Sequence, residues 1–88
     1  MLGNYPNPFN ATTRIEFDLP HQVQVSLIVY DIMGREVSTI VNESMDAGYH
    51  RVVWDGRNDS GQQLPSGIYI ASLVTAEYSK SIKMLLLK

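Results

Sequence analysis

The sequence has no cysteine among its 88 residues, and this absence excludes disulfides, thiolate metal sites and a cysteine nucleophile. It also has no run of about 18 apolar residues, the length that a membrane-spanning helix needs, and the apolar run at residues 84–87 has only the length of a strand. Basic clusters are missing as well, because the seven Lys and Arg residues are scattered and the net charge is −2. Binding to nucleic acid and insertion into a membrane are therefore not expected.

What is present is the composition of one small folded domain. Hydrophobic residues make up 44% of the chain and charged residues 18%, which is far from the signature of disorder. Residues 1–12 hold two of the four prolines, and proline favours extended backbone both at its own position and at the one before it. We expect an extended lead-in over 1–12, with Tyr5 and Phe9 lying on the core, and a β-sandwich over 13–88.

From residue 13 onward the hydrophobic pattern has a period of two, and helical periodicity is absent. This pattern predicts strands at 15–19, 23–29, 35–41, 49–55, 67–75 and 78–87, separated by turns at Pro20, Gly34, 47–48, 56–65 and 76–77. Within 49–55, we expect His50, Val52 and Trp54 to face the side opposite to Tyr49, Arg51 and Val53. Six or seven short strands favour an immunoglobulin-like antiparallel β-sandwich, whereas a single open sheet would leave apolar side chains in water.

No combination of residues points to catalysis. His21 and His50 have no further metal ligand at a suitable spacing, and the serines lack the sequence of a nucleophile elbow. Acidic residues alternate with core positions or occupy turns, where a carboxylate normally faces water. We therefore expect no enzymatic activity and no cofactor.

The loop at 55–61 raises one alternative, a calcium site. Asp55, Arg57 and Asp59 have the spacing of the first three ligands of an EF-hand, but Arg57 is a cation and no glutamate follows at the twelfth position. The favoured interpretation is that Asp55 and Asp59 cap turns through their side-chain oxygens.

Five motifs in series then carry a resemblance to a known family. They are Asn4-Tyr5-Pro6-Asn7-Pro8-Phe9-Asn10; Val29-Tyr30-Asp31 with Gly34-Arg35-Glu36-Val37; Trp54-Asp55-Gly56 with Asp59 and Gly61; Ser66-Gly67 with Tyr69; and Lys83-Met84 with Leu86-Leu87-Lys88. In this order, from about residue 2 to 88, they resemble the type A C-terminal sorting domain of the type IX secretion system. That family is similar to the immunoglobulin-like domain of flagellar hook-capping proteins. Ala11 departs from the pattern, since the family usually has a second Asn-Pro pair there.

Most of these motif residues are expected to shape the fold. The glycines suit backbone positions that a Cβ disfavours, the aromatic residues suit the core or its rim, and Arg35 is placed to pair with Asp31 across a turn. The residues of this fold signature are Tyr5, Pro6, Pro8, Phe9, Tyr30, Gly34, Arg35, Trp54, Asp55, Gly56, Gly61, Gly67 and Tyr69.

The resemblance implies a non-catalytic recognition module at the C-terminus of a secreted protein. Its partner would be the outer-membrane secretion machinery, and its location would be outside the cell or on the surface of a Gram-negative bacterium. For recognition we expect the last hairpin, 78–88, with Lys80, Lys83 and Lys88 as exposed charges; the alternative is an ordinary solvated strand face.

Two other functions remain open from the residues themselves. One is a structural assembly module whose strand edges pair with another copy or with a neighbouring domain of the parent protein. The other is carbohydrate binding, for which the candidate aromatics Tyr5, Tyr49 and Tyr78 are spread over different elements.

Overall fold

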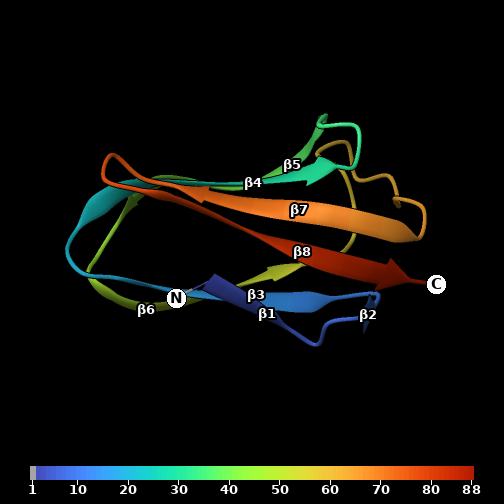
Figure 1. The fold of residues 1–88 in the computed structure, drawn as a ribbon, viewed down its shortest axis with the longest axis horizontal. Helices are drawn as coiled ribbons and strands as arrows, with labels where there is room; N and C mark the ends of the chain where they lie inside the picture. The colour runs from blue at the N-terminus through green and yellow to red at the C-terminus, as the bar shows by residue number, and fades with distance from the viewer. Residues whose placement is uncertain (1) are drawn as a thin grey trace.

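The computed structural model describes residues 2–88, which form two β-sheets stacked as layers (Figure 1). The strands are β1 (Leu2–Tyr5), β2 (Phe9–Asn10), β3 (Thr13–Leu19), β4 (Val23–Asp31), β5 (Glu36–Met45), β6 (Gly48–Trp54), β7 (Gly67–Val74) and β8 (Ser79–Leu87). One sheet has the order β1-β3-β6 and the other β2-β8-β7-β4-β5. The predicted all-β, immunoglobulin-like sandwich is confirmed, with two short strands that the sequence pattern did not resolve. Within residues 2–88, no helix has the length and apolar character needed to cross a membrane.

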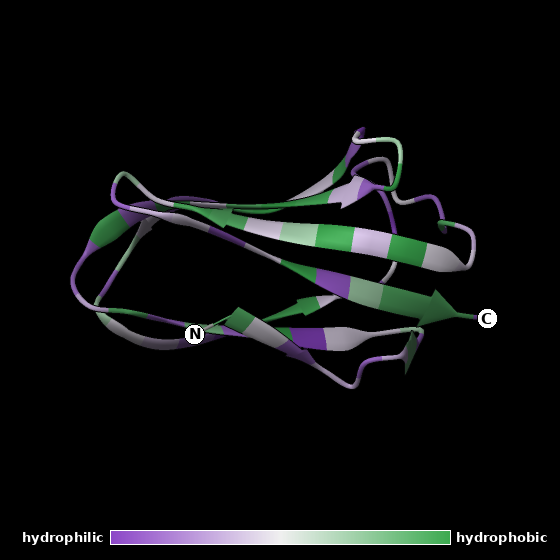
Figure 2. Ribbon diagram, in the orientation of Figure 1, coloured by the Kyte–Doolittle hydropathy of each residue, from purple (hydrophilic) through white to green (hydrophobic). Residues whose placement is uncertain are grey.

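Alternate side chains of the long strands fill the space between the sheets. On β6, Trp54 is buried and Val52 half-buried, whereas Tyr49 and Val53 are exposed, so the predicted alternation is confirmed. Figure 2 shows hydrophobic residues recurring along β7 and β8. The buried apolar residues are Phe9, Ile15, Phe17, Leu19, Val25, Leu27, Val29, Val41, Trp54, Tyr69, Ala71, Leu73, Met84 and Leu86.

Two irregularities in β5 explain why the alternation of that strand is hard to read from the sequence. The register with β4 shifts between Leu27 and Ile28 and again between Val29 and Tyr30. Ile40 and Val37 are the residues left without a direct partner at these two points. Bulged residues interrupt a period of two, and both side chains are half-buried.

Residues 2–10 form β1 and β2, joined by bends at residues 6–8, and so take part in both sheets. β1 pairs with β3 and β2 pairs in parallel with β8, so residues 2–10 cross from one layer to the other and no boundary is visible at residue 12. Phe9 lies in the core with 1% exposure. The expectation for Tyr5 is wrong: its side chain is 65% exposed because its strand position faces outward, and its ring lies beside the Arg14 guanidinium.

An aromatic junction, defined as Phe9, Trp54 and Tyr69, joins the two sheets at one end of the sandwich. The Trp54 ring lies 5.7 Å from Phe9 and 5.5 Å from Tyr69, measured between centroids. Its indole N–H donates to the Arg57 carbonyl oxygen at 3.1 Å, and the Tyr69 hydroxyl donates to the Pro65 carbonyl oxygen at 2.6 Å. The second bond has the form of a tyrosine corner, an immunoglobulin-fold feature at the start of this strand. All three aromatic residues are thus buried, and the indole N–H of Trp54 and the hydroxyl of Tyr69 each have a hydrogen-bond partner.

On each side of the five-stranded sheet, one Asx residue covers part of the outer edge of a long strand, β8 on one side and β5 on the other. At β8, the Asn7 amide donates to the Lys83 carbonyl oxygen at 3.0 Å and accepts from the Leu85 N–H at 3.1 Å. At β5, the Asp59 N–H donates to the Val37 carbonyl oxygen and the Asp59 Oδ1 accepts from the Thr39 N–H, both at 3.0 Å. Unpaired strand edges invite pairing with other chains, and here each contact occupies two of the backbone groups that an added strand would use.

We predict that Tyr69→Phe lowers the free energy of unfolding by about 1–2 kcal/mol, because it leaves the Pro65 carbonyl without its donor. Urea denaturation, followed by the fluorescence of Trp54, measures the change. Tyr5→Phe is the matched control, because the exposed Tyr5 hydroxyl supports no such bond; an equal loss in both variants would contradict the role of the corner.

Replacing each edge residue should expose one amide. Asn7→Ala should speed hydrogen exchange at the Leu85 amide roughly five- to tenfold and leave Thr39 unchanged, since a hydrogen bond is worth about 1 kcal/mol. Asp59→Ala should do the reverse, so each variant is the control for the other. Equal exchange rates in both variants and the parent would show that these contacts do not protect the edges.

The turn at His21 should add stability at low pH only. The Gln22 carbonyl oxygen and the Glu77 carboxylate, 2.7 Å from the ring, raise the pKa of His21 above its usual 6.5. A raised folded-state pKa stabilises the fold below the unfolded pKa, and the effect disappears as the pH rises through the folded value. Glu77→Gln should therefore lower Tm at about pH 5 but not at about pH 9; equal Tm changes at both would contradict the coupling.

Candidate functional site

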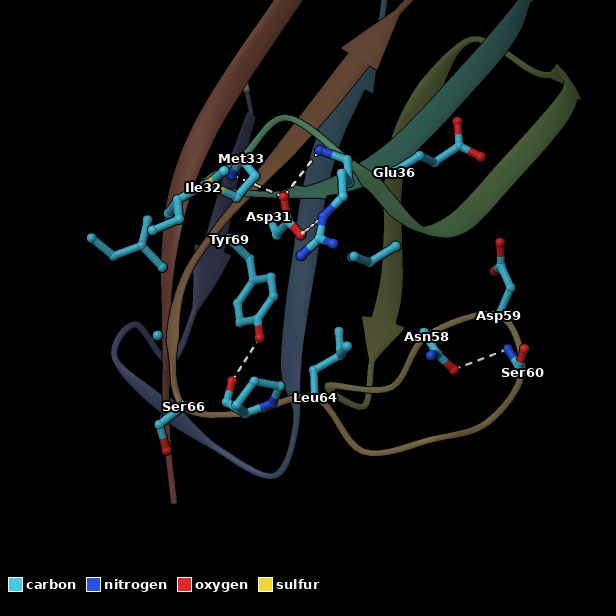
Figure 3. Close-up of a pocket in the computed structure, with 15 residues that line it drawn as sticks. Asp31, Ile32, Met33, Glu36, Asn58, Asp59, Ser60, Leu64, Ser66 and Tyr69 are labelled. Carbon is cyan, nitrogen blue, oxygen red and sulfur yellow. Dashed lines mark hydrogen bonds and ion pairs between the residues drawn. The ribbon is translucent and has the colours of Figure 1, made fainter.

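A groove of about 620 Å³ opens at the end of the sandwich where the β4–β5 turn meets the loop between β6 and β7 (Figure 3). The turn forms one wall, the loop forms the other, and the start of β7 forms the floor. It is lined by Asp31, Ile32, Met33, Arg35, Glu36, Val37, Asn58, Asp59, Ser60, Leu64, Pro65, Ser66, Gly67, Ile68 and Tyr69.

The first wall is built by Asp31. Its Oδ1 accepts from the backbone N–H groups of Met33 at 2.9 Å and Arg35 at 3.0 Å, and its Oδ2 lies 2.9 Å from the Arg35 Nε. The predicted pairing of Arg35 with Asp31 is confirmed. The Arg35 backbone N–H and then its guanidinium hold the pKa of Asp31 below its usual range. Because Gly34 has φ +82°, the turn reverses tightly and leaves Ile32 and Met33 73% and 76% exposed at the rim.

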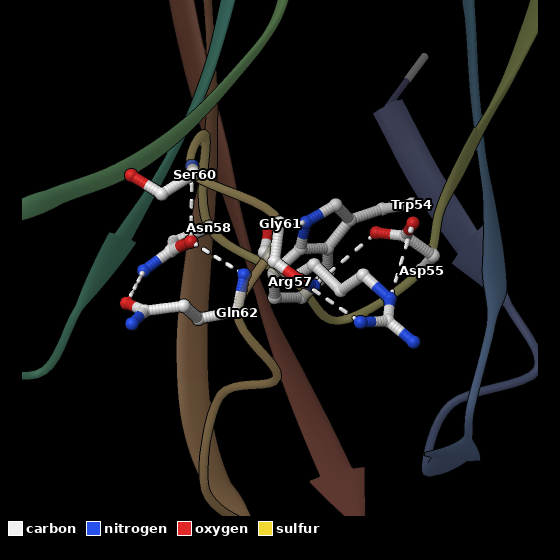
Figure 4. Close-up of polar contacts among 7 residues, drawn as sticks. All are labelled: Trp54, Asp55, Arg57, Asn58, Ser60, Gly61 and Gln62. Carbon is white, nitrogen blue, oxygen red and sulfur yellow. Dashed lines mark hydrogen bonds and ion pairs between the residues drawn. The ribbon is translucent and has the colours of Figure 1, made fainter.

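The second wall is a loop held together by its own polar side chains (Figure 4). The Asn58 Oδ1 accepts from the N–H groups of Ser60 at 3.0 Å and Gln62 at 2.9 Å. The Arg57 guanidinium donates to the Gly61 carbonyl oxygen at 2.9 Å. The loop is therefore held in shape by hydrogen bonds among its own residues.

Both carboxylates of this loop accept hydrogen bonds from backbone N–H groups, and this structural role was the alternative to calcium binding. Asp55 caps its turn by accepting from the Arg57 N–H at 3.2 Å, as expected. Asp59 binds the edge of β5 instead of its own turn, where Asn58 is the cap. Within residues 2–88, no three His, Asp or Glu side chains are placed to hold a metal ion.

The floor of the groove is Tyr69, whose hydroxyl points at Pro65. Burial, and then the negative charge of Asp31, raises the pKa of Tyr69 above 10.0. Neither histidine lines the groove. His21 contacts Glu77 at the β3–β4 turn and His50 contacts the Asp46 carbonyl oxygen. What the groove offers is a rigid surface with an apolar rim, suited to binding another molecule.

The three lysines predicted for recognition do not share one face. Lys80 occupies the register position opposite the buried Leu73, and its ammonium lies 5.5 Å from the centre of the Tyr78 ring. Lys83 lies opposite Ile70 and so points to the outer face. Lys88 follows the end of β8. All three are exposed, but their role in recognition stays a prediction.

The candidate aromatics for carbohydrate binding are also not gathered into one platform. Tyr49 lies beside the Arg51 guanidinium and donates a hydrogen bond to the Glu16 carboxylate. This bond from Tyr49 holds the pKa of Glu16 below its usual 4.5. Tyr5 stands against Arg14 on another strand of the same sheet, and Tyr78 contacts Lys80 in the other sheet.

The outer face of the five-stranded sheet is a feature that the sequence analysis did not single out. Ile68, Leu85 and Leu87 are 43%, 36% and 46% exposed on it. The available signal was the apolar character of both faces of β7 and of the end of β8, where a solvated face would alternate with polar residues.

Comparison with solved structures finds the same fold in proteins of different function. PorZ, an essential surface component of the type IX secretion system of Porphyromonas gingivalis, matches with a TM-score of 0.68 and 21% identity over 99% of this chain and 11% of PorZ. FlgD from P. aeruginosa matches with a TM-score of 0.66 and 29% identity over 84% of this chain and 57% of FlgD. The DNA glycosylase AlkC of Pseudomonas fluorescens matches with a TM-score of 0.58 and 14% identity over 99% of this chain and 29% of AlkC.

The chain thus spans a small part of PorZ and little more than half of FlgD. A search of curated proteins finds no match. The sequence model of the FlgD Ig-like domain matches residues 4–79. This range contains β2 to β7 completely and parts of β1 and β8. The family is one of structural, non-catalytic domains, and this chain belongs to the FlgD Ig-like domain family.

Proposed function

We propose that this domain is a C-terminal sorting module that directs a secreted parent protein through type IX secretion to the bacterial cell surface. The observation that carries the proposal is the ordered series of five motifs spanning the chain, from the Asn-Pro lead-in to the Lys-Met and Leu-Leu-Lys ending. The likeness to PorZ, itself a surface component of that system, supports it. The partner would be the outer-membrane secretion machinery.

The contact between residues 7–10 and the end of β8 supports a role for residues 83–88 in recognition. β2 and Asn7 bind β8 near its C-terminal end, at residues 83–87. The lead-in and ending of the motif series therefore meet in one place, where Lys83 and Lys88 are exposed. Lys80, at the other end of β8, completes the proposed set of recognition residues.

The second candidate is a structural assembly module, favoured by the 29% identity to FlgD. Such a role would require association with another copy or with a neighbouring domain. Export does not follow from that role, so an export assay separates the two candidates.

We predict that residues 2–88, fused to the C-terminus of a periplasmic fluorescent protein, bring it to the surface of a bacterium with type IX secretion. Protease shaving of intact cells detects the surface protein, and a secretion-null strain is the control. A folded fusion that stays in the periplasm would favour the assembly module.

Recognition by the lysines needs substitutions, because deletion of residues 78–88 would remove β8 and the buried Met84 and Leu86. Lys80→Ala, Lys83→Ala and Lys88→Ala together should reduce export and leave the fold intact, as judged by Trp54 fluorescence. Undiminished export of the triple variant would place recognition elsewhere.

A further inference from the structure

The outer face of the five-stranded sheet carries an apolar band. Of the nine exposed large hydrophobic residues within 2–88, six lie along this face or at the turn that continues it: Ile32, Met33, Ile68, Val74, Leu85 and Leu87. Ile68 also lines both the groove at the β4–β5 turn and a second hollow of about 360 Å³ beside Pro8 and Leu85. Clustered exposed apolar residues mark interaction surfaces.

One row of residues crosses this face with an ordered sequence of charges and apolar groups. The strand register places Lys83, Ile70, Tyr30 and Glu36 side by side on β8, β7, β4 and β5. The chain neighbours of Lys83, Ile70 and Tyr30, namely Met84, Tyr69, Ala71 and Val29, are buried, so these three residues point outward. Glu36 is exposed and pairs directly with Tyr30, so it shares the same face.

The two ends of the row carry opposite charges that are not paired within the described chain. Lys83 and Glu36 are exposed, and neither forms an ion pair with any residue of 2–88. Among residues 2–88, the polar side-chain contact of the Glu36 carboxylate is with the Thr39 hydroxyl at 3.4 Å. The row thus reads as cation, apolar, apolar, anion.

Such a row is complementary to itself under a two-fold rotation. A two-fold axis that is parallel to the strands and lies between β7 and β4 brings two copies face to face. The row of one copy then lies opposite the row of the other copy, in reverse order. Ile70 then faces Tyr30 of the second copy, and Lys83 faces Glu36 of the second copy. Symmetry repeats each contact, as in any isologous interface.

We propose that the outer face of the five-stranded sheet is a homodimer interface, with Ile70 and Tyr30 at its centre and two Lys83–Glu36 ion pairs at its sides. The charges select this arrangement: an axis perpendicular to the strands would bring Lys83 against Lys83, which is repulsive. Facing sheets lie about 10 Å apart, a distance that the long Lys and Glu side chains can span.

The size of the face predicts weak association. Four strands spaced about 4.8 Å apart, over roughly six residues each, offer on the order of 400–500 Å² per copy. A standard interface buries about 800 Å² per partner. We therefore expect a dimer that forms at high concentration and weakens with added salt.

Sedimentation velocity over about 10 µM to about 1 mM of the 88-residue chain tests the interface. The parent should shift from monomer to dimer across this range. Lys83→Glu and Glu36→Lys alone should each weaken dimerisation about tenfold or more, because each turns two attractive contacts into repulsive ones. The double variant Lys83→Glu with Glu36→Lys should restore it.

Lys80→Glu is the matched control, because it changes the same charge on the same strand at a position of the opposite face. Its dimerisation should equal that of the parent. A parent that remains monomeric to about 1 mM, or a double variant no stronger than the single ones, would overturn the proposal. Association that only Asn7→Ala enhances, and that Glu36→Lys leaves unchanged, would indicate pairing at the β8 edge instead. Sedimentation measures self-association and does not depend on export. The sorting proposal can therefore fail while the dimer proposal holds.

Discussion

The rest of the structure depends on the packing of Trp54 between Phe9 and Tyr69. Trp54 ends β6 in one sheet, whereas its two ring partners belong to the other sheet. A sandwich of this size has only one thin core, so a large aromatic side chain that contacts both layers fixes their separation. The same indole anchors the start of the following loop through the Arg57 carbonyl oxygen. The core contact and the shape of the surface groove are thus set together.

Sheet edges are the second constraint, and the chain meets it with side chains instead of extra strands. Asn7 and Asp59 come from opposite parts of the sequence and occupy equivalent pairs of backbone groups, two residues apart, on β8 and β5. With part of each edge covered in this way, the broad outer face of the five-stranded sheet is the larger surface available for contact with other proteins. That face carries both the apolar band and the charged row that the edges frame.

Much of this fold could be predicted from period-two patterns and turn residues. The six long strands were located to within a few residues, and the Asp31–Arg35 contact followed from a four-residue spacing. Local patterns could not show that the lead-in enters both sheets, because its partners lie in β3 and in β8, far along the chain. They also missed the outward position of Tyr5, which is set by its register with Arg14. Lys80 and Lys83 lie on opposite faces because they are an odd number of residues apart along β8. The bulges at Val37 and Ile40 depend on the pairing of β5 with β4.

The position of β8 has a consequence for when the domain can fold. Of the eight strands of this domain it is the last to be synthesised, yet it lies between β2 and β7 and supplies Met84 and Leu86 to the core. Until it arrives, β7 has an open edge and Phe9 lacks the strand that β2 pairs with. Domains generally fold as units while the chain is being made. Here the core cannot close until residue 86 is available, so the domain can complete its fold only after the last of its eight strands has been made.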